Sequence, residues 1–174
     1  MRLFYPDESG FSPSLPTGYS WCLPGQRKRV KYEYPQGRRV NALATYEPSA
    51  RSLGVVPFER TLTSDDLLAY LRDRLPAADV PRVVVPGNAG VHTSKVVRAA
   101  RPGRARLGVY LYDLPPYSPE LNRIEPVLKQ AKHHEMPTRS FTTRADLRKA
   151  VEDGFDAYRK RRAGKGDNKP RLAA

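Results

Sequence analysis

Short hydrophobic segments recur along the chain, and prolines separate many of them. The apolar runs at 39–46, 80–85 and 107–114 are rich in β-branched and aromatic residues, a composition typical of strands that are buried or half-buried. A shorter apolar run, Leu3-Phe4-Tyr5, predicts a further strand at the start of the chain. The frequent prolines indicate that all of these strands are short.

Other segments carry apolar residues at helical spacing. Thr63 is a candidate N-cap for a helix with leucines at 67, 68, 71 and 75. Helical periodicity also covers 93–100, 119–133 and 144–158. Because strands and helices alternate, the pattern predicts an α/β fold with a central sheet. The periodicity ends at 158, so 159–174 is predicted to be a basic, disordered tail.

The composition of the chain indicates that its binding partner is a polyanion. The 174 residues suit one domain, and their 31 lysines and arginines against 18 acidic residues give a net charge of +13. A single cysteine excludes an internal disulfide and a cysteine-cluster zinc site. No apolar run approaches the roughly 20 residues of a membrane span. We therefore expect a soluble, cytoplasmic protein that is not a membrane protein.

Acidic residues are scarce, and three blocks at predicted strand ends or helix starts draw attention. The first holds Asp7, which is expected to project from the first strand. The second follows the strand that ends at Val85, a position where α/β folds often place functional groups. The third carries Glu125 beside the apolar stripe of the third helix. In one-letter code the blocks read DESGF (7–11, with WCLPG at 21–25), VVVPGNAGVH (83–92) and LPPYSPELNRIE (114–125).

In this order, the blocks resemble the catalytic domain of DDE-superfamily transposases, in the mariner-like group of bacterial insertion sequences. The resemblance implies a ribonuclease-H-like fold over 1–158, with a mixed central sheet flanked by helices, and a bacterial protein associated with the nucleoid. It also implies that the helix-turn-helix region found upstream in such transposases is absent. The implied activity is hydrolysis of a DNA phosphodiester, followed by joining of the freed 3′ hydroxyl to target DNA.

The resemblance further implies that three acids hold two divalent cations, Mg²⁺ or Mn²⁺, which stabilise the attacking and leaving oxygens. By motif position, Asp7 and Glu125 are the first and third of these acids, with catalytic and metal-binding roles. Gly87 stands at the position of the second acid, 37 residues lie between it and Glu125, and no carboxylate occurs between Arg82 and Arg106. The hypothesis is a crippled transposase domain with weakened metal binding.

Two alternatives to this hypothesis stay open. One is a non-enzymatic remnant that binds DNA or serves as an accessory subunit of an intact transposase, and a homodimer is a related possibility. The other, an unrelated basic protein that binds RNA or ribosomes, accounts for the charge and leaves the three blocks unexplained. Backbone phosphates are the expected target of the basic residues, and those proposed to bind nucleic acid are Arg27, Lys28, Arg29, Lys31, Lys95, Arg98, Arg101 and Lys132.

Four further features of the sequence bear on the site. Pro126 directly follows Glu125, so the third helix either kinks or begins late with Pro126 in its first turn. The family usually has tryptophan where Leu128 stands. His92 either orients a site carboxylate or phosphate, or is structural. The pair His133-His134 lacks partner ligands at metal spacing and is interpreted as a solvated helix end.

Overall fold

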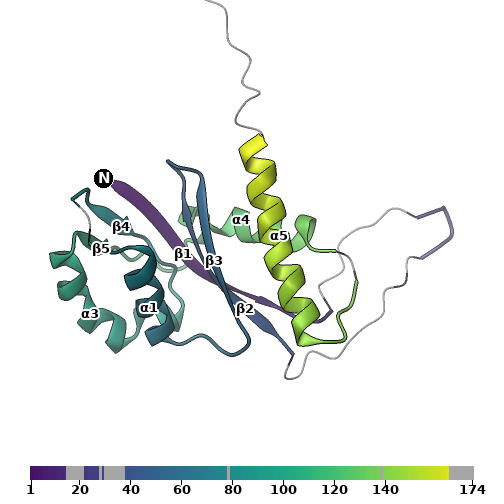
Figure 1. Cartoon of the computed structure of the whole chain (residues 1–174), viewed down its shortest axis with the longest axis horizontal. Helices are drawn as coiled ribbons and strands as arrows, with labels where there is room; N and C mark the ends of the chain where they lie inside the picture. The colour runs from purple at the N-terminus through teal and green to yellow at the C-terminus, as the bar shows by residue number, and fades with distance from the viewer. Residues whose placement is uncertain (15–21, 28, 30–37, 78, 138, 165–174) are drawn as a thin grey trace, which may run out of the picture.

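The computed structural model describes residues 1–14, 22–27, 29, 38–77, 79–137 and 139–164 (Figure 1). Its strands are β1 (Arg2–Phe11), β2 (Val40–Glu47), β3 (Ser52–Phe58), β4 (Arg82–Val84) and β5 (Val109–Leu111). Its α-helices are α1 (Ser64–Arg74), α2 (Gly90–Thr93), α3 (Lys95–Arg106), α4 (Glu125–Gln130) and α5 (Arg144–Gly164). A 3-10 turn, η1 (Pro119–Leu121), precedes α4, and a π-helical turn, η2 (Ala131–Glu135), follows it.

The strands form one mixed sheet in the order β3-β2-β1-β4-β5. β1 pairs antiparallel with β2 and parallel with β4, and its pairing with β4 extends only to Phe4 opposite Val84. The N–H of Val85 donates to the carbonyl of Phe4 at 2.7 Å. β1 therefore continues past the end of β4, so that Asp7 lies near the segment that follows β4.

Two hydrophobic clusters cover opposite faces of this sheet. Side chains alternate along β2, with Leu43 in the cluster of α1 and α3, and Ala42 and Ala44 in the cluster of α4 and α5. In Figure 1, α1 and α3 lie to the left and α5 lies to the right. Asp7 shares its face of β1 with Tyr5, which packs against the second cluster, so its side chain faces α4.

Most predicted elements are confirmed, but several differ in extent, and β1 continues to Phe11, well past the apolar run that predicted it. β3 was not predicted. The helix expected at 93–100 is α3, which begins at Lys95 and continues to Arg106, while Thr93 ends the separate short helix α2. The Ser94 side chain caps α3 by accepting from the N–H of Val97. The third helix begins late, with Pro126 in the first turn of α4. This late start resolves the choice between a kink and a delayed helix.

The boundary predicted at 158 needs a correction, since α5 continues to Gly164. Basic side chains beyond 158 have partners within α5 and on neighbouring elements. Arg159 Nε donates to the carbonyl of Leu53 at 3.0 Å, Arg161 pairs with Glu135, and the Arg162 guanidinium lies over the ring of Tyr158. These contacts explain why α5 continues beyond 158, where the periodic pattern of apolar residues ends. The rest of the predicted tail, 165–174, lies outside the described residues.

The N-terminus of α1 has the predicted cap in full. The Thr63 side chain accepts from the N–H of Asp66, and the Asp66 carboxylate accepts from the N–H of Thr63. We expect Thr63→Ala to lower the free energy of unfolding by about 1 kcal/mol in urea denaturation. Thr61→Ala, at an exposed threonine outside the cap, is the control. Equal stability of the two variants would contradict this role.

Among the residues that the structure describes, no helix combines the length and the hydropathy that a membrane span requires.

Candidate functional site

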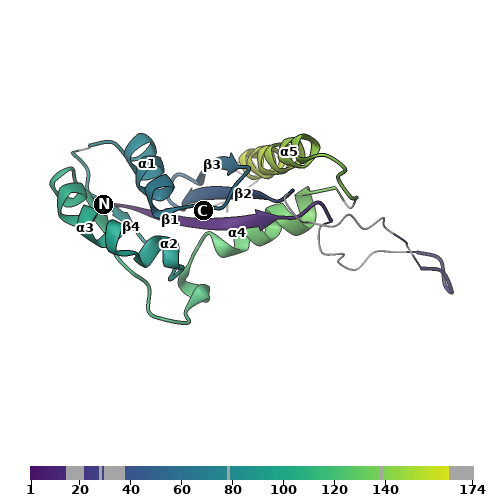
Figure 2. The same cartoon turned by 90° about the horizontal axis from the view of Figure 1, so that it is seen from below.

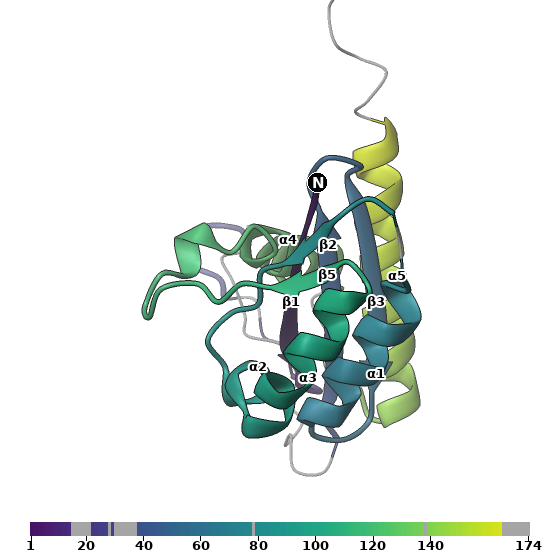
Figure 3. The same cartoon turned by 90° about the vertical axis from the view of Figure 1, so that its left-hand side faces the viewer.

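The three sequence blocks meet around one cavity of about 230 Å³. β1 supplies Asp7, the segment after β4 supplies Gly87, and the first turn of α4 supplies Glu125. The segment between β5 and α4, which stands out from the body of the domain in Figures 2 and 3, forms a further wall. The lining residues are Asp7, Gly87, Asn88, Ala89, Leu114, Tyr117, Ser118, Pro119, Asn122 and Glu125.

Gly87 faces directly into this group of polar side chains. A Cβ atom built on Gly87 would lie 3.5 Å from Asn122 Nδ2 and 3.9 Å from Asp7 Oδ1. These are ordinary van der Waals distances, and the φ angle of Gly87 lies outside the left-handed region. A side chain is therefore accommodated at this position, where it would start among Asn122, His92 and Asp7.

Asp7 occupies an environment that disfavours its negative charge. Its Oδ1 accepts from the N–H of Glu8 at 2.9 Å, and its Oδ2 accepts from Asn122 Nδ2 at 3.0 Å. Burial above all, and then the charge of Glu8, raise the pKa of Asp7 to about 7, with a smaller contribution in the same direction from Glu125. The cavity consequently favours a proton or a cation beside this carboxylate.

Asn122, which also lines the cavity, has a buried oxygen that lacks a hydrogen-bond partner among the described residues. Its side chain is only 2% exposed, and Oδ1 has no hydrogen-bond partner among the described residues. A buried acceptor without a donor is costly unless something else satisfies it. Carboxylate and amide oxygens are the hard ligands that Mg²⁺ and Mn²⁺ prefer. Asp7, Asn122 and Glu125, which line the same cavity, thus carry oxygen atoms of the kind that a divalent cation takes as ligands.

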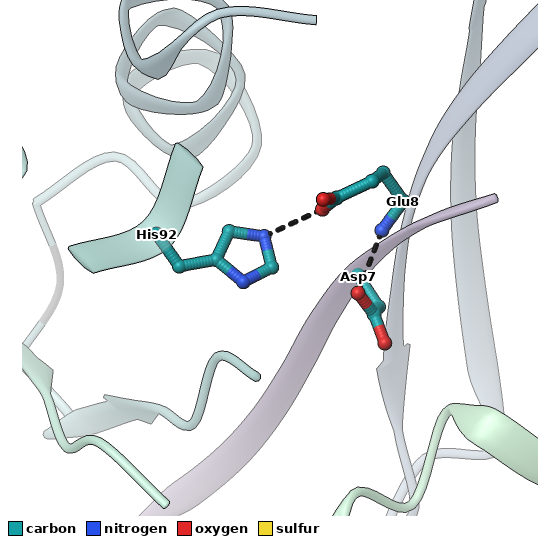
Figure 4. A group of neighbouring side chains, drawn as sticks. All are labelled: Asp7, Glu8 and His92. Atoms are coloured by element: carbon teal, nitrogen blue, oxygen red, sulfur yellow. Dashed lines mark hydrogen bonds and ion pairs between the residues drawn. The ribbon is translucent and has the colours of Figure 1, made fainter. Parts of the chain in front are cut away.

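On the opposite face of β1, Glu8 forms an ion pair with His92 of α2 (Figure 4). His92 is fully buried, its Nε2 lies 2.8 Å from Glu8 Oε2, and its Nδ1 lies 3.0 Å from the carbonyl of Gly87. A carbonyl can only accept, so Nδ1 is the donor in this contact. His92 thus connects the strand that carries Asp7 to the segment that carries Gly87.

Burial and charge act in opposite directions on this ion pair. Burial alone would lower the pKa of His92, but the hydrogen bond and the charge of Glu8 outweigh it and raise that pKa. Burial would raise the pKa of Glu8, but the contacts with His92 outweigh it and lower that pKa. Both shifts favour the charged pair. Asp7, Glu8 and His92 also bring one potential metal-ligand atom each within 4.8 Å of one another, a group that does not include Glu125.

The basic residues proposed from the sequence differ in their surroundings. Arg27, Arg29, Lys95 and Arg98 are exposed. Arg101 instead donates to both carboxylate oxygens of Asp113, at 2.6 and 2.7 Å, and half-buried Lys132 donates to the carbonyl of Gly10 at 2.7 Å. Lys28 and Lys31 lie outside the described residues. His133 and His134 are exposed in η2.

Three residues that shape the cavity had no role predicted from the sequence. Asn122 binds Asp7, Asn88 Nδ2 donates to the carbonyls of Leu114 and Pro115, and Tyr117 lines the opening. All three lie inside the quoted blocks. Their positions inside these blocks were the available signal.

Comparison with known proteins identifies related sequences and folds. A family model described as DDE superfamily endonuclease matches residues 2–148. The Mos1 transposase paired-end complex with left transposon end has 17% identity and a TM-score of 0.59, and the match covers 95% of this chain and 56% of that one. The Mos1 mariner paired end complex with Mn has 16% identity and a TM-score of 0.57, with coverages of 97% and 56%.

These structures establish the fold of the chain. The Mos1 Strand Transfer Complex also matches, with 16% identity, a TM-score of 0.59, and coverage of 91% of this chain and 51% of that one. At such identities the likeness concerns the fold alone, and the predicted ribonuclease-H-like fold with its mixed sheet is confirmed. The chain spans about half the length of these solved structures. A search of curated proteins found no match.

Proposed function

The chain belongs to the DDE superfamily of endonucleases, and from that premise we propose that it is a transposase-type catalytic domain whose metal site lacks its second acid. The observation that carries this proposal is the direction in which a side chain at position 87 would point. Its missing side chain would enter the cavity beside Asp7, and Glu125 lines the same cavity. The site has the layout of three acids around one cavity, with two acids present.

In this proposal, Asp7 and Glu125 hold Mg²⁺ or Mn²⁺ with help from Asn122. The chemistry such cations supply when bound is stabilisation of charge on the attacking and leaving oxygens of a phosphodiester. The N–H of Glu8 and the amide of Asn122 orient the Asp7 carboxylate. The pair of Glu8 and His92 holds the segment of Gly87 against β1. These residues position the site but do not replace the absent carboxylate.

Because the carboxylate at position 87 is absent, we infer that cation binding is weak and that cleavage and joining of DNA strands are largely lost. A cation at Asp7 must displace a proton at pH values below about 7, because burial and neighbouring acids raise the pKa of that carboxyl. A third carboxylate would offset this cost by adding negative charge. Without it, the site holds its cations less tightly than a complete triad.

DNA is the proposed ligand of the basic surface. The net charge of +13 favours a polyanion, and exposed Lys95 and Arg98 on α3 are available to bind phosphates. The same deficit at Gly87 favours a second candidate function, a DNA-binding remnant without chemistry. Such a remnant would act as a homodimer or as an accessory subunit of an intact transposase.

We expect the wild-type protein to bind duplex DNA with an affinity that falls steeply with salt, and to leave supercoiled plasmid intact in Mg²⁺ or Mn²⁺. Replacing both Lys95 and Arg98 by Gln should reduce the slope of log affinity against log salt by roughly 0.9 for each DNA phosphate that the variant no longer neutralises. Fluorescence anisotropy at several salt concentrations measures the slope, and agarose gels detect nicking.

Lys149→Gln is the matched control, because Lys149 lies on α5 across the sheet and already pairs with Asp153 at 3.0 Å. It should leave the salt slope nearly unchanged. Salt-independent binding would contradict the role of the basic surface. Efficient metal-dependent nicking by the wild-type protein would contradict the loss of chemistry.

A further inference from the structure

Tyr117 combines an unusual backbone with full exposure at the opening of the cavity. Its φ angle is +57°, in the left-handed region that bulky residues rarely adopt. Its side chain is 100% exposed, the largest value among the described large hydrophobic residues that are exposed. The protein therefore holds an aromatic ring in solvent at a backbone position that glycine or asparagine would occupy more easily.

Packing does not explain this ring. Tyr117 is absent from both hydrophobic clusters, and its hydroxyl makes no hydrogen bond within the described part of the chain. Pro115 and Pro116 precede it and restrict the backbone of the segment. Strained backbone that survives without a packing reason is common where a protein contacts a ligand.

The location of the ring indicates what it would contact. Tyr117 lines the same cavity as Asp7 and Glu125, where the proposed function places a phosphodiester. A nucleotide whose phosphate lies in this cavity carries its base only a few ångströms away. Both faces of an exposed ring are free to stack on such a base, and stacking tolerates any base because every base has a π-face.

We propose that Tyr117 is a stacking platform for an unpaired nucleobase adjacent to the phosphodiester bound in the cavity. This inference rests on the proposed function, because it requires DNA at the site. An unpaired base is the expected partner, since bases inside a duplex are already stacked on their neighbours and must leave the stack to reach a protein side chain. The ligand is thus single-stranded or locally unpaired DNA.

The test compares two single-stranded oligonucleotides of equal length, one with bases and one composed of abasic sites, by anisotropy of an end label. The wild-type protein should prefer the oligonucleotide with bases. Tyr117→Ala should reduce this preference by roughly 5- to 150-fold, the range that corresponds to removal of one stacked base. Tyr117→Phe keeps the ring and should retain the preference.

Two further variants separate stacking from a structural role. Tyr117→Gly relieves the backbone strain, so it should melt at the same temperature as wild type or higher while losing the preference for bases. Tyr112→Ala removes a tyrosine that is 66% exposed in the same segment but does not line the cavity, and it should bind as wild type does.

Each outcome bears on one proposal or on both. If wild-type protein binds both oligonucleotides equally, or if Tyr117→Ala keeps the preference for bases, the stacking proposal is wrong while DNA binding stands. If wild-type protein binds neither oligonucleotide nor a duplex, the DNA ligand of the proposed function is wrong, and the stacking proposal falls with it.

Discussion

Replacing Gly87 by aspartate is expected to raise the affinity for Mn²⁺ by at least about tenfold and to give the protein metal-dependent nicking activity. The new carboxylate would start from a Cβ atom 3.9 Å from Asp7 Oδ1 and would complete the set of acids around the cavity. Isothermal titration calorimetry with Mn²⁺ and Mg²⁺ measures the affinity, and plasmid nicking measures the chemistry.

Stability provides an independent readout of the same variant. Two carboxylates this close repel each other, so Gly87→Asp should melt below wild type in the absence of metal. Mn²⁺ should then raise its melting temperature more than it raises that of wild type, because a ligand that binds only the folded state stabilises it.

Two controls make the result specific to a carboxylate in the cavity. Gly87→Asn has nearly the same shape without the charge and should gain little affinity. Gly90→Asp adds an acid three residues away, at a glycine whose Cβ position has no atom within 4 Å, and should gain none. If Gly87→Asp binds Mn²⁺ no better than Gly87→Asn does, the site has lost more than one acid.

Replacing Asp7 by asparagine is expected to stabilise the folded protein at pH 8 by about 2–4 kcal/mol while further weakening cation binding. Burial and the charge of Glu8 raise the pKa of this carboxyl from 3.8 to about 7, and each unit corresponds to about 1.36 kcal/mol. The Asn122 amide, whose Oδ1 has no partner among the described residues, can rotate to accept from the new amide.

The sign of the pH dependence follows from this raised pKa. Below about pH 4, Asp7 is protonated in both folded and unfolded chains, so its effect on stability is absent. As the pH rises to about 7, the unfolded chain releases the proton before the folded chain does, and wild-type stability falls. In Asp7→Asn this part of the decline should disappear, as urea denaturation at pH 5 and pH 8 would show.

Asp73→Asn, at an exposed carboxylate on α1, is the matched control and should leave the pH dependence as it is in wild type. His92 also contributes to the wild-type curve, because its raised pKa gives stability that is lost as the pH increases. The comparison of Asp7→Asn with wild type isolates the part that Asp7 contributes. Equal slopes for the two proteins would contradict the raised pKa of Asp7.

The strand β3 illustrates why sequence patterns missed part of the fold. Ser52–Phe58 contains Gly54 and Pro57, which weaken the signal of a strand. The structure tolerates Pro57 because β3 is at the edge of the sheet, and it requires a small residue at 54 because a Cβ there would lie 2.8 Å from the Tyr70 hydroxyl. The first reason depends on the pairing of β3 with β2, and the second depends on its packing against α1. Neither can be deduced from the local sequence.

The candidate site, too, was only partly predictable from the sequence. The blocks containing Asp7, Gly87 and Glu125 were recognisable in the sequence, and the structure brings them around one cavity. The hydrogen bond between Asn122 and Asp7 joins residues 115 positions apart, and the ion pair of Glu8 and His92 depends on where α2 lies against β1. Such interactions follow from tertiary packing, so residue spacing alone could not predict them.

The space around Gly87 has a consequence for how this chain could change. Neighbouring side chains have not filled the position, since no atom approaches an added Cβ closer than 3.5 Å. Every glycine codon becomes a codon for aspartate or glutamate when its middle base changes from G to A. A single nucleotide substitution at this codon would therefore put an acid back into the cavity, without any compensating change elsewhere in the gene.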